Sequence, residues 1–131
     1  MNYLLDVNAL VALGFSHHEF HARVAAWIRA ESPIVTTCPI TELGFVRVLA
    51  QAPGYGVSVL QAQTILLRLK KSTALSYTFL PDDHDISHLP RWVKTPKQTT
   101  DGHLVQLARS HGAVLATLDE RIPEAYVIPH P

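Results

Sequence analysis

The stretch MNYLLDVNALVALGF at residues 1–15 is apolar except for a few polar residues, of which Asp6 is the only charged one. Residues 3–5 form an apolar run directly before Asp6, which predicts a short buried strand that ends at this acid. Residues 8–15 then predict a brief helix. The sequence therefore places an acid, Asp6, at the carboxyl end of a buried strand.

Strand and helix patterns alternate along the remaining chain. Apolar runs predict further strands at residues 34–37, 77–80, 113–118 and 126–128. Apolar spacing predicts helices at residues 19–30, 39–51, 58–71 and 100–110. Ser16 and Glu19 have the spacing of a capping box before the first of these helices, Pro39 suits the first position of the second, and Gly112 suits the end of the last. This alternation predicts an α/β fold with a parallel sheet covered on both faces.

Residues 81–100 form a long segment without such a pattern. The segment is polar and rich in proline, so we predict a loop with a single helical turn. It carries Arg91, Trp92, Lys94 and Lys97. An aromatic ring among cations could stack on a base while the cations hold phosphates, which makes these four residues candidates for RNA binding. The alternative, which we favour, is that Trp92 anchors the loop on the body of the domain.

The composition indicates a folded globular protein. The 131 residues suit one domain, spanning residues 1–131, and 47% are hydrophobic against 17% charged. No apolar run is long enough to cross a membrane, and the N-terminus lacks the pattern of a signal peptide. The single cysteine, Cys38, cannot form an internal disulfide. We therefore expect a soluble protein of the cytoplasm.

The net charge does not by itself indicate a nucleic-acid binder. Eleven Lys and Arg residues balance eleven Asp and Glu residues. Proteins that bind nucleic acids usually carry a basic surplus, because neutralising phosphates supplies much of their affinity. Zero net charge is compatible with an enzyme whose acids hold metal ions, since a bound cation reverses the local field.

Four acids occupy positions that suit a common site. Asp6 and Asp119 each follow a predicted strand, and two carboxylates at one edge of neighbouring strands repel each other unless a cation lies between them. Glu42 and Asp101 fall in the first turns of predicted helices, where the alternative explanation is a favourable interaction with the helix dipole. In a parallel sheet, strand ends and the first turns of the following helices face the same edge, where ligands bind.

Carboxylate oxygens suit Mg²⁺ or Mn²⁺ rather than zinc, and such a site can bind one or two ions. Asn8 and Thr117 each lie two residues from an acid and could orient a carboxylate or water. The alternatives are helix capping for Asn8 and strand propensity for Thr117. Arg47 lies one turn beyond Glu42 and could pair with an acid of the cluster.

Four motifs carry a resemblance to a known family. They are LLDVNAL at residues 4–10, ITELGFVRVL at 40–49, TTDGHLVQLA at 99–108 and ATLDERI at 116–122. None is specific alone, but the ordered set resembles PIN domains, especially the VapC-type toxins of type II toxin–antitoxin pairs. The resemblance spans almost the whole chain.

The resemblance implies a three-layer α/β/α fold with a central parallel sheet of four or five strands. It implies an endoribonuclease that uses a divalent metal ion. Asp6, Glu42 and Asp101 match the family's core metal acids, Asp119 the fourth, and Asn8 and Thr117 the polar residues that support them. It also implies a homodimer and a cognate antitoxin that occludes the site.

Three other functions compete with this interpretation. A phosphatase of the haloacid dehalogenase type needs a second aspartate where this chain has Asn8. A receiver-like signalling module needs an acid pair after the first strand and a lysine after the last, and the sequence has neither. A non-catalytic PIN-like scaffold that binds RNA or protein is the third, and the presence of all four acids argues against it.

Overall fold

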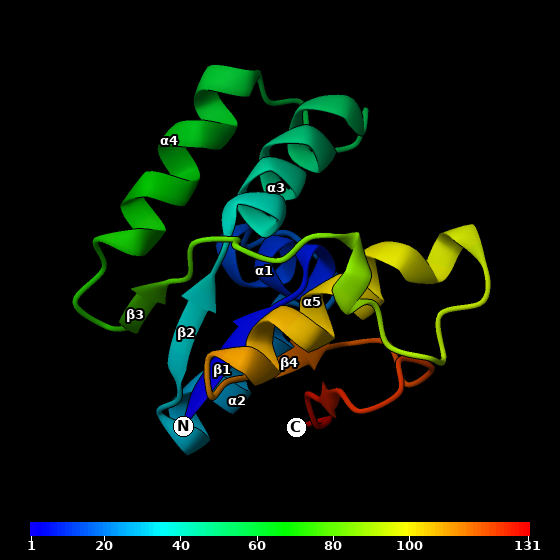
Figure 1. Ribbon diagram of the computed structural model, residues 1–131. Coiled ribbons are helices and arrows are strands. Elements are labelled where there is room, and N and C mark those ends of the chain that lie inside the picture. The colour runs from blue at the N-terminus through cyan, green and yellow to red at the C-terminus, as the bar shows by residue number, and fades with distance from the viewer.

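Five parallel strands form the central sheet of the computed structural model, which describes all 131 residues. In chain order the strands are β1 (Asn2–Leu5), β2 (Ile34–Thr37), β3 (Ser76–Phe79), β4 (Val114–Thr117) and β5 (Tyr126–Val127). Their order across the sheet is β3-β2-β1-β4-β5, and every pair is parallel. All five carboxyl ends therefore lie at one edge, with the end of β1 in the middle (Figure 1).

The register brings the ends of β1 and β4 side by side. Leu4 pairs with Leu115 of β4 on one side and with Thr36 of β2 on the other. The Asp6 amide continues the ladder by donating a 3.1 Å hydrogen bond to the carbonyl of Ala116. The acid after β1 is therefore held beside the last residues of β4.

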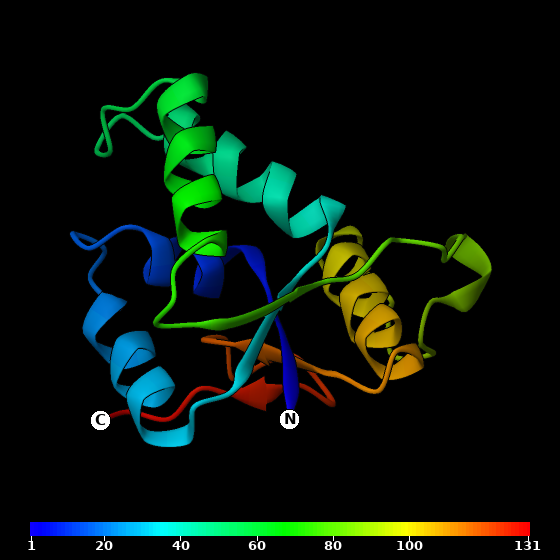
Figure 2. The ribbon, with the colours of Figure 1, turned by 90° about the vertical axis from the view of Figure 1, so that its left-hand side faces the viewer.

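Helices cover both faces of the sheet. They are α1 (Val7–Gly14), α2 (His21–Glu31), α3 (Pro39–Gln51), α4 (Val59–Lys70) and α5 (Thr99–Ser110). Figure 2 shows α5 on one side of the strands and α1 and α2 on the other. This is the three-layer α/β/α arrangement with a five-stranded parallel sheet that the sequence predicts.

The alternation of side chains in β1 divides the core between these two faces. Leu5 is fully buried in a cluster formed with α1, α2, α3 and α4. Leu4 is fully buried in a second cluster built mainly by α5 and β4. Successive strand residues point to opposite faces, so two adjacent leucines supply both layers.

Several predicted helix ends are confirmed. Pro39 is the first residue of α3, and Thr41 completes a capping box with Cys38, whose amide donates to the Thr41 hydroxyl over 3.0 Å. Ser58 caps α4 together with Gln61. Gly112 follows the end of α5 with a φ of 70°, a conformation that favours glycine.

The predicted start of the second helix is wrong. The helix begins at His21, and its N-cap residue, Phe20, makes no side-chain capping bond. Ser16 and Glu19 form no capping box, because His18 instead accepts the Phe20 amide at Nδ1 over 3.0 Å. The ring of His21 lies 2.7 Å from the carbonyl of Ala12, so the start of α2 is tied to the end of α1.

The segment between β3 and α5 contains two short 3-10 turns, Ile86–His88 and Pro96–Gln98, where one helical turn was predicted. Trp92 packs against the α5 side of the core and donates from Nε1 to the carboxylate of Glu124 over 3.1 Å. This placement supports the anchoring role predicted for Trp92. None of the helices has the length and apolar character needed to span a membrane.

Candidate metal centre

Asp6 is the most buried acid at the carboxyl edge of the sheet. Only 7% of the residue is exposed. Its Oδ1 accepts the amide of Ala9 over 2.9 Å and thereby caps α1, and its Oδ2 accepts the hydroxyl of Thr117 over 2.6 Å. Asp6, rather than Asn8, is therefore the capping residue, and both of its oxygens are fixed by neighbouring elements.

The charge on Asp6 is costly in this environment. Burial raises the pKa of Asp6 to about 6, although the Thr117 and Ala9 hydrogen bonds oppose the shift. The negative charges of Asp101 and Asp119 raise it further. The three acids therefore repel one another across the edge of the sheet, which is the relationship predicted for carboxylates that share a cation.

Asp101 lies in the first turn of α5 and carries the least compensated charge of the three. No protein group donates a hydrogen bond to its carboxylate, and burial together with the charge of Asp119 raises its pKa. Helix-dipole matching alone would lower the pKa of an acid in a first turn. The opposite shift favours a role in binding a cation.

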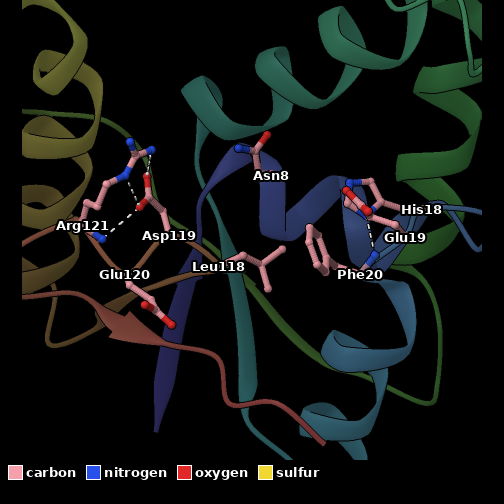
Figure 3. Close-up of a pocket in the computed structure, with 8 residues that line it drawn as sticks. All are labelled: Asn8, His18, Glu19, Phe20, Leu118, Asp119, Glu120 and Arg121. Atoms are coloured by element: carbon pink, nitrogen blue, oxygen red, sulfur yellow. Dashed lines mark hydrogen bonds and ion pairs between the residues drawn. The ribbon is translucent and has the colours of Figure 1, made fainter.

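Asp119 follows β4 and is held by its own loop. Its amide donates to the hydroxyl of Thr117 over 3.0 Å. Its carboxylate accepts Nε and Nη2 of Arg121 over 3.0 and 3.1 Å, as Figure 3 shows. These hydrogen bonds from Arg121 lower the pKa of Asp119. The Thr117 hydroxyl thus contacts both the Asp6 carboxylate and the Asp119 amide.

Glu42 lies in a separate network at the end of β2. Its Oε2 accepts hydrogen bonds from Thr37 (2.6 Å) and Tyr77 (2.9 Å) and forms a 2.8 Å ion pair with Lys70. Burial alone would raise the pKa of Glu42, but the bonds from Lys70, Thr37 and Tyr77 lower it below its usual range. Its carboxylate is already neutralised, unlike those of Asp6 and Asp101.

The donor set of the other three acids suits a hard divalent cation. Asp6, Asp101 and Asp119 offer only oxygen atoms, and the raised pKa values of the first two mark negative charge that the protein leaves uncompensated. No three His, Cys, Asp or Glu side chains already surround a point at metal-ligand distances. Asp6, Asp101 and Asp119 are the residues that would hold a divalent cation at this edge.

The remaining predicted site residues fall into two groups. Asn8 is exposed and lines a hollow of about 570 Å³ together with Asp119. Arg47 is exposed on α3, where it lines a surface groove with Leu43 and Val59, and it forms no ion pair with any acid. The structure thus brings Asn8 to the carboxyl edge and places Arg47 in a different environment.

The loop before α5 brings two of its four candidate RNA-binding residues to the acids. Trp92 and Lys97 line a pocket of about 220 Å³ that Asp101 and Asp119 also line. Arg91 and Lys94 are exposed elsewhere on the same loop.

Arg121 was not predicted as a site residue, yet it lines both the 570 Å³ hollow and the 220 Å³ pocket. The two-residue spacing from Asp119 was the available signal. An aspartate side chain readily accepts the amide two residues later, and the Arg121 amide donates to Asp119 over 2.9 Å. That turn also returns the Arg121 side chain toward the carboxylate.

Comparison with known proteins agrees with this architecture. Residues 3–128 match the PIN domain family. The chain is 39% identical to ribonuclease VapC38 of Mycobacterium tuberculosis over 88% of this chain and 84% of that protein. It is 35% identical to ribonuclease VapC39 of the same organism over 95% of this chain and 94% of that protein.

A solved structure supports the fold. The crystal structure of Mycobacterium tuberculosis VapC20, described as a toxin that cleaves the sarcin-ricin loop, superposes with a TM-score of 0.70. The superposition covers 98% of this chain and 99% of that one at 15% sequence identity. Together with the sequence matches, the five-stranded sheet and its acidic edge lead to one conclusion: this chain belongs to the PIN domain family.

Proposed function

We propose that this protein is a divalent-metal-dependent endoribonuclease that hydrolyses RNA phosphodiester bonds as the toxin of a toxin–antitoxin pair. The observation that carries the proposal is the cluster of Asp6, Asp101 and Asp119 at the carboxyl edge of the sheet, in which the protein leaves the negative charges of Asp6 and Asp101 uncompensated. The ribonuclease relatives support the same reaction, since they match 35–39% of residues over most of the chain.

Asp6, Asp101 and Asp119 would hold the metal ion, with Glu42 as a fourth acid. Their oxygen ligands suit Mg²⁺ or Mn²⁺. A divalent ion at such a site supplies an activated water molecule and stabilises the charge that develops on the phosphodiester. Thr117 would keep the Asp6 carboxylate oriented, since its hydroxyl already binds Oδ2.

The remaining acids at the edge of the sheet differ in how their carboxylates are held. No protein group donates a hydrogen bond to the Asp101 carboxylate. This carboxylate is therefore free to bind the ion or to accept a hydrogen bond from water. Asp119 would bind the ion with a carboxylate that also accepts Arg121. Glu42 would contribute through the end of β2, where Thr37 and Tyr77 hold its Oε2. Asn8 faces the adjoining hollow and can bind water or substrate there.

We propose RNA, a cognate antitoxin and a second copy of the chain as partners. Three large apolar side chains are exposed on α3 and α4, namely Leu43 (69%), Val59 (61%) and Leu60 (71%). Such a surface favours association with another protein. Cys38 is a free and fully buried thiol, which supports a location in the reducing cytoplasm.

The decisive experiment is RNA cleavage by the purified protein in Mg²⁺ or Mn²⁺, compared with EDTA. We expect cleavage that requires the metal and is abolished in Asp6→Asn and Asp101→Asn. The matched control is Asp85→Asn, which removes an exposed acid far along the loop. A folded wild-type protein that leaves total RNA intact in both metals would favour the scaffold function instead.

A further inference from the structure

The Asp119–Arg121 pair separates two hollows at the acidic edge. One hollow, of about 570 Å³, is lined by residues of α1, the α1–α2 turn and the loop after β4 (Figure 3). The other, of about 220 Å³, is lined by the loop before α5 and the start of that helix. Asp119 and Arg121 line both. An extended polymer that crosses Asp6, Asp101 and Asp119 would therefore pass from one hollow to the other over Arg121.

Arg121 is the one permanently cationic side chain that the two hollows share. The larger hollow is also lined by three carboxylates, those of Glu19, Asp119 and Glu120. In the smaller one Lys97 is the second cation. Arg121 is therefore the side chain that can attract a phosphate electrostatically from either hollow.

The side chain of Arg121 is held only by Asp119. Its guanidinium makes two bonds to that carboxylate, while 88% of the side chain is exposed. A metal ion held by Asp119 would therefore compete with Arg121 for this carboxylate. Weakening of the ion pair would free the guanidinium for an anion, and a guanidinium binds phosphate with the same two-pronged geometry.

Aromatic rings lie in both hollows. Phe20 is 39% exposed and lines the larger one, where Figure 3 shows its ring between Leu118 and His18. Trp92, which its bond to Glu124 holds against the body of the domain, also lines the smaller one. A nucleic-acid base can stack on such a ring only when the base is unpaired, because the faces of paired bases are stacked inside a duplex.

We propose that Arg121 exchanges the Asp119 carboxylate for a phosphate of single-stranded RNA, with the flanking nucleotides in the two hollows. This inference rests on the proposed function. It assigns Arg121 as a substrate-binding residue.

The first test is binding of a fluorescent single-stranded RNA oligonucleotide with Mn²⁺ present, in an Asp101→Asn background that prevents cleavage. Adding Arg121→Ala should weaken binding about tenfold. It should also reduce the slope of log K against log salt by about 0.7, the effect of losing one phosphate contact to a single strand. The matched control is Arg29→Ala, an exposed arginine outside both hollows. The same RNA as a duplex should bind more weakly than the single strand.

The second test measures Mn²⁺ affinity without RNA, in the protein with all four acids intact. Arg121→Ala should bind Mn²⁺ several-fold more tightly, because the competing cation is gone, whereas Arg29→Ala should not change. Opposite effects on RNA and metal affinity are not expected from a merely structural ion pair.

Three outcomes overturn the inference. Arg121→Ala matching Arg29→Ala in both assays removes any role in substrate binding. A loss of RNA and Mn²⁺ affinity together indicates a structural role. Equal binding of duplex and single strand shows that the two hollows do not hold unpaired nucleotides. If the wild type cleaves RNA in metal but shows one of these results, only the inference fails; if it neither cleaves nor binds RNA, the proposed function fails with it.

Discussion

The ammonium group of Lys70 lies 2.8 Å from the carboxylate of Glu42, which follows β2 on one side of the central strand β1, whereas Asp119 follows β4 on the other side. Lys70 also lies over the rings of Tyr77 and Phe79, at 5.4 and 5.2 Å from their centres. Glu42 is thereby neutralised by the protein, while Asp6 and Asp101 are not. The four acids predicted to form the site thus belong to two different electrostatic environments.

Replacing Lys70 with Met should leave Glu42 charged and partly buried without its cation. Both side chains are about one-fifth exposed, so we expect a loss of about 1 kcal/mol in the free energy of unfolding at pH 7, measured with urea. The lowered pKa of Glu42 means that the pair stabilises the fold above about pH 4.5 and loses its effect as the pH falls below that value.

Lys71→Met is the control for this prediction, because Lys71 is exposed and forms no ion pair. It should change the free energy of unfolding by less than about 0.5 kcal/mol. Equal stability of the Lys70 and Lys71 variants at pH 7 would show that the Glu42 ion pair contributes nothing.

Replacing Asp6 with Asn should stabilise the metal-free protein at pH 7.5. The amide oxygen can still accept the Ala9 amide, and the amide nitrogen can face the Thr117 hydroxyl, but the buried charge is gone. The folded protein holds the pKa of Asp6 at about 6 against a usual value of 3.8, so the gain is about 2–3 kcal/mol in EDTA.

The destabilisation of the fold by ionised Asp6 depends on pH. Ionised Asp6 destabilises the fold above pH 6, and the penalty disappears as the pH falls from about 6 to 3.8. The stability difference between Asp6→Asn and the wild type should therefore shrink over that range. Adding Mg²⁺ should stabilise only the wild type. An Asn variant less stable than the wild type in EDTA at pH 7.5 would contradict the argument.

Replacing Gly102 with Ala should separate the loop before α5 from the helix that carries Asp101. A Cβ atom at Gly102 would lie 2.3 Å from Cγ2 of Val93 and 3.3 Å from Cδ of Pro90. We expect the free energy of unfolding to fall by about 1–3 kcal/mol, the usual cost of overpacking. RNA cleavage should also fall, because the displaced loop carries Trp92 and Lys97 beside Asp101.

Gly54→Ala is the matched substitution, since a Cβ atom there would meet nothing within 4 Å. It should leave stability and cleavage within about 0.5 kcal/mol and twofold of the wild type, respectively. A Gly102 variant that behaves like the Gly54 variant would mean that the loop yields without strain.

Local patterns predicted most of the elements of this fold. Helix α3 spans the predicted residues 39–51, and β2 the predicted residues 34–37, because proline and runs of β-branched residues act over a few positions. The start of α2 was missed because His18 binds the Phe20 amide and His21 binds α1. The second of these contacts joins two helices and has no local signature.

The sequence by itself determined the order of strands and helices and put Asp6, Glu42, Asp101 and Asp119 at the carboxyl edge, since strand ends and first turns in a parallel sheet must face one way. Only the tertiary structure decided which charges are compensated. Thr117 bridges Asp6 and Asp119, Arg121 covers Asp119, and Lys70 neutralises Glu42, leaving Asp6 and Asp101 uncompensated. The Thr117–Asp6 and Lys70–Glu42 contacts join residues far apart in the chain, and charge compensation depends on distance and burial, which no local pattern encodes.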